Sequence, residues 1–425
     1  MVRPSSFDPV KPASRRNISV SLGSIPVAVL LMYIAVTAGI CVSFVREIGA
    51  TYSFATEWEL TRFAFSTSLG RLATLLDLLQ KGCLLLLLLR SVVSRDNKHL
   101  ILSVVAISAF AIYGSIGVLI DGVSFFDMLF GSVPLTMLLI PLFVTMAQDK
   151  TLVRCLARLA PAASAVSFGL SFISVVHFHL MCGWGSTVGW CPARDLIALG
   201  ISFLWVTVIL SDEKDCSYLF KICLCLTSMV IAFLLTGRSW VIQSVLSLLL
   251  VSLSSPSSNK RMRRISFTIC IAVVAFLAVS SIFPDVMGAF TERLNEDTRS
   301  GQYEVFFAQV DPLTLIFGNG STAGYSYGTQ SNYLYFDNQF LYLAFHYGAI
   351  PVLTLFIVLM RAMVSKGGGS LRSARYVAVL YLMALLGLSN YYSFDMTAGI
   401  AALFIGFGAA TDWRNPDTGQ NGLRG

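Results

Sequence analysis

The sequence predicts an all-α fold, that of a polytopic integral membrane protein. Hydrophobic residues fill 56% of the 425 positions and charged residues only 12%, too few charges to cover a soluble protein of this length. Mean hydropathy is +0.74. Apolar runs near the roughly 20 residues needed to cross a bilayer recur along nearly the whole chain. Because these runs are too long and too uniformly apolar for barrel strands, helices must satisfy the backbone in lipid.

The apolar runs predict about twelve membrane crossings. The expected spans are residues 25–45, 69–92, 100–120, 125–147, 157–177, 196–211, 218–236, 239–254, 265–283, 338–361, 376–389 and 396–411. No small-residue cleavage site follows the first run, so we expect a retained helix and no signal peptide. The chain then divides into a cytoplasmic tail at 1–24, a single transmembrane domain at 25–411 and a second cytoplasmic tail at 412–425.

Basic residues predict the sidedness of these spans. The net charge is +7, and the basic residues cluster in the N-terminal tail and in short connections such as 260–264. This is the positive-inside pattern of a membrane protein, with the lipid bilayer as partner, and it does not indicate a nucleic-acid partner. Both termini are therefore expected in the cytoplasm, and the longest connection, 284–337, lies outside, before the tenth helix.

The 284–337 loop is expected to be ordered. Val305, Phe306, Val310 and Leu313 follow a helical spacing, and a Gly/Ser/Tyr-rich segment occupies 318–333. Long ordered loops in compact proteins usually carry function.

Two of the nine cysteines are disulfide candidates. Cys182 and Cys191 fall in one short outer loop, where an oxidising compartment would join them. The other seven lie in apolar runs or on their inner side and are expected to pack as small hydrophobes. The cysteine spacing does not predict a metal site.

Two arginines on the outer side are candidates for binding an anion. Arg238 lies where the seventh and eighth spans meet across a very short turn, at the depth of lipid headgroups, and a guanidinium there can bind phosphate with two parallel hydrogen bonds. The alternative is a snorkelling arginine at a helix end. Arg299 lies among Glu296, Asp297 and Glu304, so it is either a second cation of the site or a neutralised residue on a solvated helix face.

A carboxylate opens the tenth span. Asp337, followed by Asn338, is either a positioned acid or base at the membrane surface or the N-cap of the helix. Gly348 would allow a neighbouring helix to approach closely. His346 is expected to be a packed residue.

One acid and one base lie within an apolar run. Asp77 and Lys81 stand one helical turn apart, which favours an intrahelical ion pair over an ion pathway.

In this order, the motifs resemble the superfamily of O-antigen polymerases and O-antigen ligases. The resemblance rests on Thr236-Gly237-Arg238, on Arg299 leading into Pro312-Leu313 and Phe317-Gly318-Asn319-Gly320, and on Asp337-Asn338 with Gly348 after them. It covers roughly 236–348, whereas the N-terminal half matches only as generic membrane helices.

The resemblance implies a C-type membrane glycosyltransferase that needs no metal or cofactor. Ligases of this superfamily typically carry a histidine where this chain has Asp337, so the resemblance favours a polymerase acting on undecaprenyl-diphosphate-linked glycan in the bacterial inner membrane, with its site facing the periplasm. Arg238 and Arg299 would balance the diphosphate charge, and Asp337, or alternatively Glu304, would be the general base. Arg293 and Asn338 are further candidates for substrate binding.

The same resemblance implies flippase and chain-length regulator proteins as partners. A ligase acting on lipid A core is the nearest alternative function. A polytopic lipid or oligosaccharide transporter is the alternative of a different class, and only the Asp77 and Lys81 pair favours it.

Overall fold

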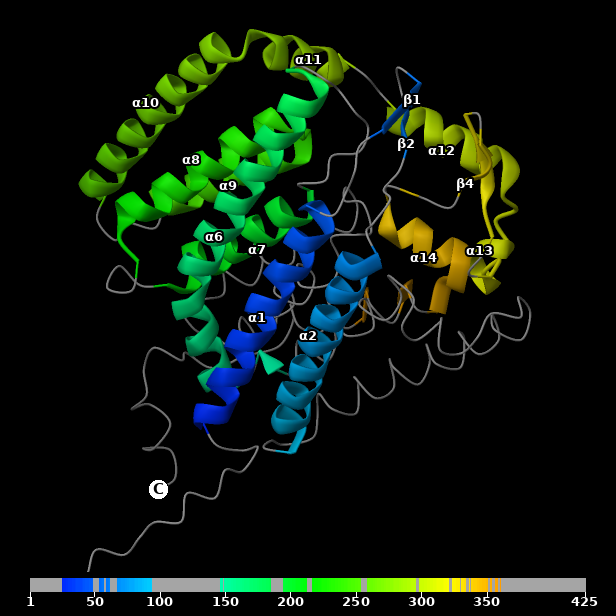
Figure 1. The fold of residues 1–425 in the computed structure, drawn as a ribbon, viewed down its shortest axis with the longest axis horizontal. Coiled ribbons are helices and arrows are strands. Elements are labelled where there is room, and N and C mark those ends of the chain that lie inside the picture. Colours follow the sequence, from blue (N-terminus) through cyan, green and yellow to red (C-terminus); the bar gives the residue numbers. More distant parts are fainter. Residues whose placement is uncertain are drawn as a thin grey trace, which may run out of the picture.

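The structure of the chain is a computed structural model, shown in Figure 1. It describes residues 25–48, 67–93, 149–184, 194–211, 216–253, 258–295, 298–320 and 338–350, with shorter stretches between 53 and 61, at 146–147, between 323 and 336 and between 352 and 360. Within these residues the chain is mostly helical, as expected for an all-α membrane protein.

The described elements are helices and two small sheets. The helices are α1 (Ile25–Ile48), α2 (Thr67–Val93), α6 (Lys150–Cys182), α7 (Arg194–Leu210), α8 (Tyr218–Leu234), α9 (Arg238–Leu253), α10 (Ser258–Ile282), α11 (Pro284–Asn295), α12 (Thr298–Gln309), α13 (Thr314–Phe317) and α14 (Gln339–Tyr347). The strands form two antiparallel pairs, β1 (Ser53–Thr56) with β2 (Glu59–Thr61), and β3 (Tyr325–Tyr327) with β4 (Gln330–Tyr333).

Four described helices are long and apolar enough to cross a membrane. Their candidate spans are Ile25–Glu47, Leu69–Arg90, Thr151–Leu180 and Met262–Ile282. Three shorter apolar helices follow α6, with apolar stretches at Asp195–Leu210, Tyr218–Leu234 and Arg238–Ser252. The chain is therefore a membrane-embedded protein by the length and composition of its helices.

The predicted spans can be compared with these helices. The spans at 25–45, 69–92, 157–177, 196–211, 218–236, 239–254 and 265–283 coincide with α1, α2 and α6 to α10. The span at 338–361 begins as α14 and is interrupted at Gly348, where φ is +87°. The spans at 100–120, 376–389 and 396–411 lie outside the described residues, as does nearly all of 125–147, so the count of twelve stays a prediction.

The membrane helices pack around α6 and α7. Helix α1 lies beside α2 and α6, and α7 packs on α6, α8 and α9 (Figure 1). Helix α7 is buried along most of its length, with Leu196, Ile201 and Phe203 fully inaccessible. A helix that is enclosed by other helices needs no polar face towards water. The predominantly apolar sequence of α7 fits this position. Helix α10 lies at the edge of the bundle, with only 6% of its candidate span buried.

Polar contacts pin the helices at defined points. The Ser228 and Ser244 hydroxyls are 2.6 Å apart between α8 and α9, and the Ser164 hydroxyl donates to the Gly200 carbonyl at 3.0 Å between α6 and α7. At the opposite end of α6 from Cys182, Asp149 caps the helix by accepting from the Thr151 amide at 2.9 Å. The same carboxylate pairs with Arg90 of α2, joining the expected inner ends of the two helices.

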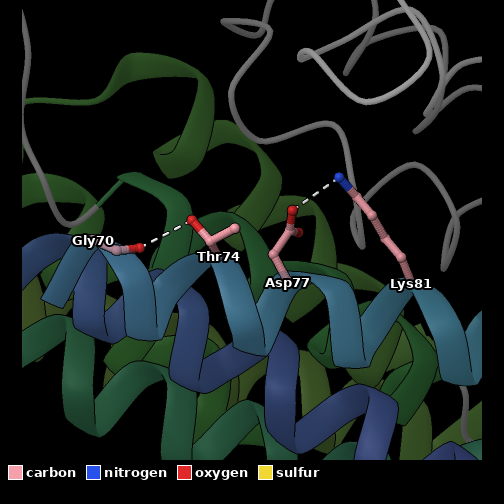
Figure 2. Close-up of polar contacts among 4 residues, drawn as sticks. All are labelled: Gly70, Thr74, Asp77 and Lys81. Carbon is pink, nitrogen blue, oxygen red and sulfur yellow. Dashed lines mark hydrogen bonds and ion pairs between the residues drawn. The ribbon is translucent and has the colours of Figure 1, made fainter. Parts of the chain in front are cut away.

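Asp77 and Lys81 form the predicted intrahelical pair. Their charged atoms are 2.9 Å apart on one face of α2, next to a Thr74 hydroxyl that donates to the Gly70 carbonyl (Figure 2). The prediction of an ion pair within the helix is confirmed.

The described residues of the 284–337 segment form helices, a hairpin and a small aromatic core. Phe306 of α12 is fully buried and contacts Tyr325, Phe336 and Phe345, with ring centroids 4.6 to 5.3 Å apart. Burying one such ring contributes about 2–3 kcal/mol, and the edge-to-face contacts add to this. The predicted helical face is confirmed at Phe306 and Val310. Leu313 lies beyond the end of α12 and is exposed.

Helix α14 connects this aromatic core with the membrane helices. Leu343 is buried in the main core, whereas Phe345, two residues later, belongs to the aromatic core. Positions two apart point to nearly opposite faces of a helix, so α14 is packed on both sides. The first half of the predicted tenth span thereby fixes the loop against the bundle.

Candidate functional site

The turn that carries Arg238 is a tightly bonded helix end. The Gly237 amide donates to the Ala232 carbonyl at 2.9 Å and the Thr236 amide donates to the Phe233 carbonyl at 2.8 Å. This pair of bonds defines a Schellman motif, in which the residue after the helix adopts a left-handed conformation. Thr236 has a φ of +50°, which is unusual and costly for a β-branched residue. The turn therefore holds Arg238 in a fixed place at some expense in backbone strain.

Arg238 is the first residue of α9 and is partly exposed. The positive end of the helix dipole lies at this terminus, so a cation here does not stabilise α9. Together, the guanidinium and the helix terminus make a locally positive surface that suits an anion.

Two neighbouring elements support the same turn. The Nε2 atom of His179 in α6 lies 3.0 Å from the Leu234 carbonyl at the end of α8, and its ring stacks on Trp184 at 4.8 Å. From the other side, Phe290 of α11 packs on Phe233 at 5.1 Å. This role of His179 could not be predicted from sequence, because its partner is a backbone carbonyl 55 residues along the chain.

Helix α11 also carries Arg293, one turn beyond Phe290. This places the backbone of Arg293 on the helix that contacts the end of α8. The conformation of the Arg293 side chain lies outside the described residues, and so does that of Arg299, although α12 includes the Arg299 backbone.

Asn338 joins α14 to the helix that carries Arg299. Its side-chain oxygen accepts from the Phe340 and Leu341 amides, which makes Asn338 the N-cap, and its Nδ2 lies 3.3 Å from the Tyr303 hydroxyl. Tyr303 follows Arg299 by one helical turn, so the two residues lie along the same face of α12. The structure thus brings the Arg299 turn next to the start of α14.

The alternative assignment of Asp337 as the N-cap is wrong, because Asn338 performs that role. Asp337 itself lies outside the described residues, and its role as a base stays a prediction. Glu304, the alternative base, is exposed on α12 next to Tyr303.

Gly348 makes the predicted close approach, but its neighbour is a loop and not a helix. The backbone of Gly318, with φ +83°, lies so close that a Cβ atom added to it would be 2.8 Å from the Gly348 nitrogen and from the His346 carbonyl oxygen. Beyond it, the Asn319 amide donates to the Phe345 carbonyl at 2.7 Å. His346 is buried, as predicted for a packed residue, and its Nδ1 lies 2.9 Å from the Gly320 carbonyl.

The predicted disulfide involves residues near the C-terminal end of α6. Cys191 and the side chain of Cys182 lie outside the described residues, so their pairing is a prediction. Within the described part of the chain, His, Cys, Asp and Glu do not gather in any group of three that would hold a metal ion.

Searches of protein-family models, curated proteins and solved structures find no match to this chain.

Proposed function

We propose that this chain is a bacterial O-antigen or exopolysaccharide polymerase that works at the periplasmic face of the inner membrane. It would transfer a growing glycan from undecaprenyl diphosphate to the non-reducing-end hydroxyl of a lipid-linked repeat unit. The observation that carries the proposal is the hydrogen bond between Asn338 and Tyr303, because it links the Arg299 turn of α12 to the start of α14. This contact supports the proposal that two motifs separate in the sequence contribute to one site.

The chemistry of the residues fits this transfer. The acceptor hydroxyl oxygen attacks the anomeric carbon, the bond from that carbon to the diphosphate oxygen breaks, and Asp337 takes the hydroxyl proton. Arg238 and Arg299 balance the negative charge that develops on the departing undecaprenyl diphosphate. Arg293 and Asn338 contribute to substrate binding in this proposal.

The transporter alternative loses its main support, because Asp77 and Lys81 are paired within α2 (Figure 2). The ligase alternative differs in its product and not in the architecture it requires. A gel of envelope glycans distinguishes the two functions, since deleting a polymerase leaves a single repeat unit on the core and deleting a ligase leaves none.

Variants of the arginines test the site. Arg238→Ala and Arg299→Ala should abolish long-chain glycan at unchanged protein abundance, because loss of one transition-state donor costs about 3–4 kcal/mol. Lysine should substitute poorly, since it keeps the charge but loses the two-pronged hydrogen bonding. Arg263→Ala is the matched control. Arg263 is exposed near the start of α10, in the basic connection that is expected on the cytoplasmic side, and it should be dispensable. Near-normal polymer from both alanine variants would refute the proposed site.

Variants of the carboxylates test the base. Asp337→Asn should abolish polymer, whereas Glu304→Gln should retain it if Asp337 is the base. The reverse result would move the role to Glu304.

Reporter fusions test the sidedness. A reporter that is active only outside the cytoplasm should be active after Gly320 and silent after Gly368. The opposite pattern would place the site in the cytoplasm and overturn the proposal.

A further inference from the structure

Three large apolar side chains are exposed together around α13. Leu313 is 62% exposed, Ile316 46% and Phe317 72%, all within five consecutive residues of a loop predicted to lie outside the membrane. An isolated exposed apolar residue needs no explanation, but a contiguous set marks an interaction surface. Asp311, just before the set, is exposed and would remain in water.

Backbone N–H groups of this segment donate hydrogen bonds within the protein, as is required where water is absent. The amides of residues 313 to 316 donate to Asp311, Pro312 or Leu313, and the amide of Gly318 donates to the Thr314 carbonyl. Pro312 has no N–H group. The amides of Asn319 and Gly320 donate to the carbonyls of α14. Satisfaction of these donors inside the protein is the condition for placing irregular backbone at membrane depth.

The segment contacts the chain at the end of α14, where further helical residues follow. Gly318 meets Gly348, and among the described residues from 349 to 360 the exposed side chains are all apolar: Ile350, Leu353, Phe356, Ile357 and Met360, each 41% to 57% exposed. These residues lie in the apolar run predicted as the tenth span, where such exposed side chains are expected to face lipid. Phe317 and Ile350 flank the same backbone contact, so the exposed apolar surface continues from one to the other. The contact between Gly318 and Gly348 lies about 15 Å from the Asn338 cap along the axis of α14, at a rise of about 1.5 Å per residue.

We propose that Leu313, Ile316 and Phe317 form a wedge that inserts into the outer leaflet of the bilayer. The wedge would hold the 298–320 segment at a fixed depth beside the start of α14. This inference depends on exposure and backbone bonding and not on the proposed enzymatic function. Lipid is the expected partner, because the exposed apolar surface continues from the wedge onto the predicted tenth span.

A fluorescence depth measurement on the full-length protein in lipid nanodiscs tests the wedge. Phe317→Cys, labelled with the fluorophore NBD, should emit at shorter wavelength and lose most of its emission when the nanodiscs contain nitroxide-labelled phosphatidylcholine. Aqueous iodide should have little effect. Ser326→Cys is the matched control, since Ser326 is exposed on β3 and should be quenched by iodide and not by the lipid nitroxide. Labelling of the unsubstituted protein gives the background from the native cysteines.

A second variant keeps the test decisive if labelling at 317 disturbs the loop. Ile316→Cys labelled in the same way should show the lipid response, and adding Phe317→Asp should move its emission to longer wavelength. Quenching of both wedge labels by iodide would overturn the inference in favour of a solvated loop. Protection of both labels from both quenchers would overturn it in favour of a protein partner or a second copy of the chain.

Discussion

Replacement of Gly318 by alanine tests the contact that fastens the 298–320 segment to α14. Two physical effects act at this position. Gly318 has a φ of +83° and a ψ of +156°, a backbone conformation that is essentially restricted to glycine and costs an L-residue about 1–3 kcal/mol. A Cβ atom would also come within 2.8 Å of backbone atoms of His346, Tyr347 and Gly348, which cannot swing away as the end of a flexible side chain can.

The loop must therefore move, and the bonds beside it should be lost. The hydrogen bonds from the Asn319 and Gly320 amides to α14 measure 2.7 and 3.2 Å, and each contributes about 0.5–1.5 kcal/mol net. The sum with the backbone cost is about 2–6 kcal/mol of local stability, which corresponds to amide exchange faster by about 30-fold to on the order of 10,000-fold.

Two other glycines provide controls for the separate effects. Gly328, in the turn between β3 and β4, has a φ of +60° but open space around its Cα, so alanine there should cost only about 1–2 kcal/mol. Gly301 lies in α12 with open space and an ordinary helical backbone, so alanine should stabilise the helix by about 1 kcal/mol.

The assay is hydrogen exchange measured by mass spectrometry on the reconstituted protein. Peptides covering α14 should exchange much faster in Gly318→Ala than in Gly328→Ala, and no faster than the parent in Gly301→Ala. If Gly318→Ala and Gly328→Ala affect α14 equally, the close approach of Gly318 to Gly348 is wrong.

Three further predictions concern other parts of the molecule. Cys182 and Cys191 should resist labelling by a membrane-impermeant maleimide until reductant is added. A disulfide that closes so small a loop should contribute about 2–3 kcal/mol to local stability. Quantitative labelling without reductant would exclude the bond. Arg90→Ala should lower the melting temperature strongly, because an unpaired buried carboxylate at Asp149 costs about 3–5 kcal/mol. Adding Asp149→Asn should recover much of the loss while keeping the cap, and failure to recover would contradict the ion pair as its cause. Thr236→Gly should raise the melting temperature by relieving about 1–2 kcal/mol of left-handed strain, whereas Thr236→Ala should not.

The helices at the N-terminal side of the loop could be predicted closely from sequence. The apolar runs at 25–45 and 69–92 match α1 and α2 because hydropathy and length are local properties of a segment. The Asp77 and Lys81 pair was equally predictable, since one turn of helix separates the two residues.

The site was predicted in part. The short turn at Arg238 was expected from sequence and is present, whereas the close approach expected at Gly348 is made by the backbone of Gly318 and not by a neighbouring helix. The hairpin of β3 and β4 was not expected, because its short, aromatic-rich strands are stable only when packed on α12 and α14. The cap of α14 was assigned to Asp337, and the hydrogen bonds of Asn338 show that the next residue performs this role.

The sequence by itself determined that this protein is helical and membrane-embedded, because those properties depend on how many consecutive residues are apolar. The tertiary structure decided which distant residues meet. It joined Asn338 to Tyr303, Gly318 to Gly348 and Arg90 to Asp149. Each of these contacts depends on how the helices pack and on where the chain reverses. The residue type at one position does not specify which distant residue it will contact.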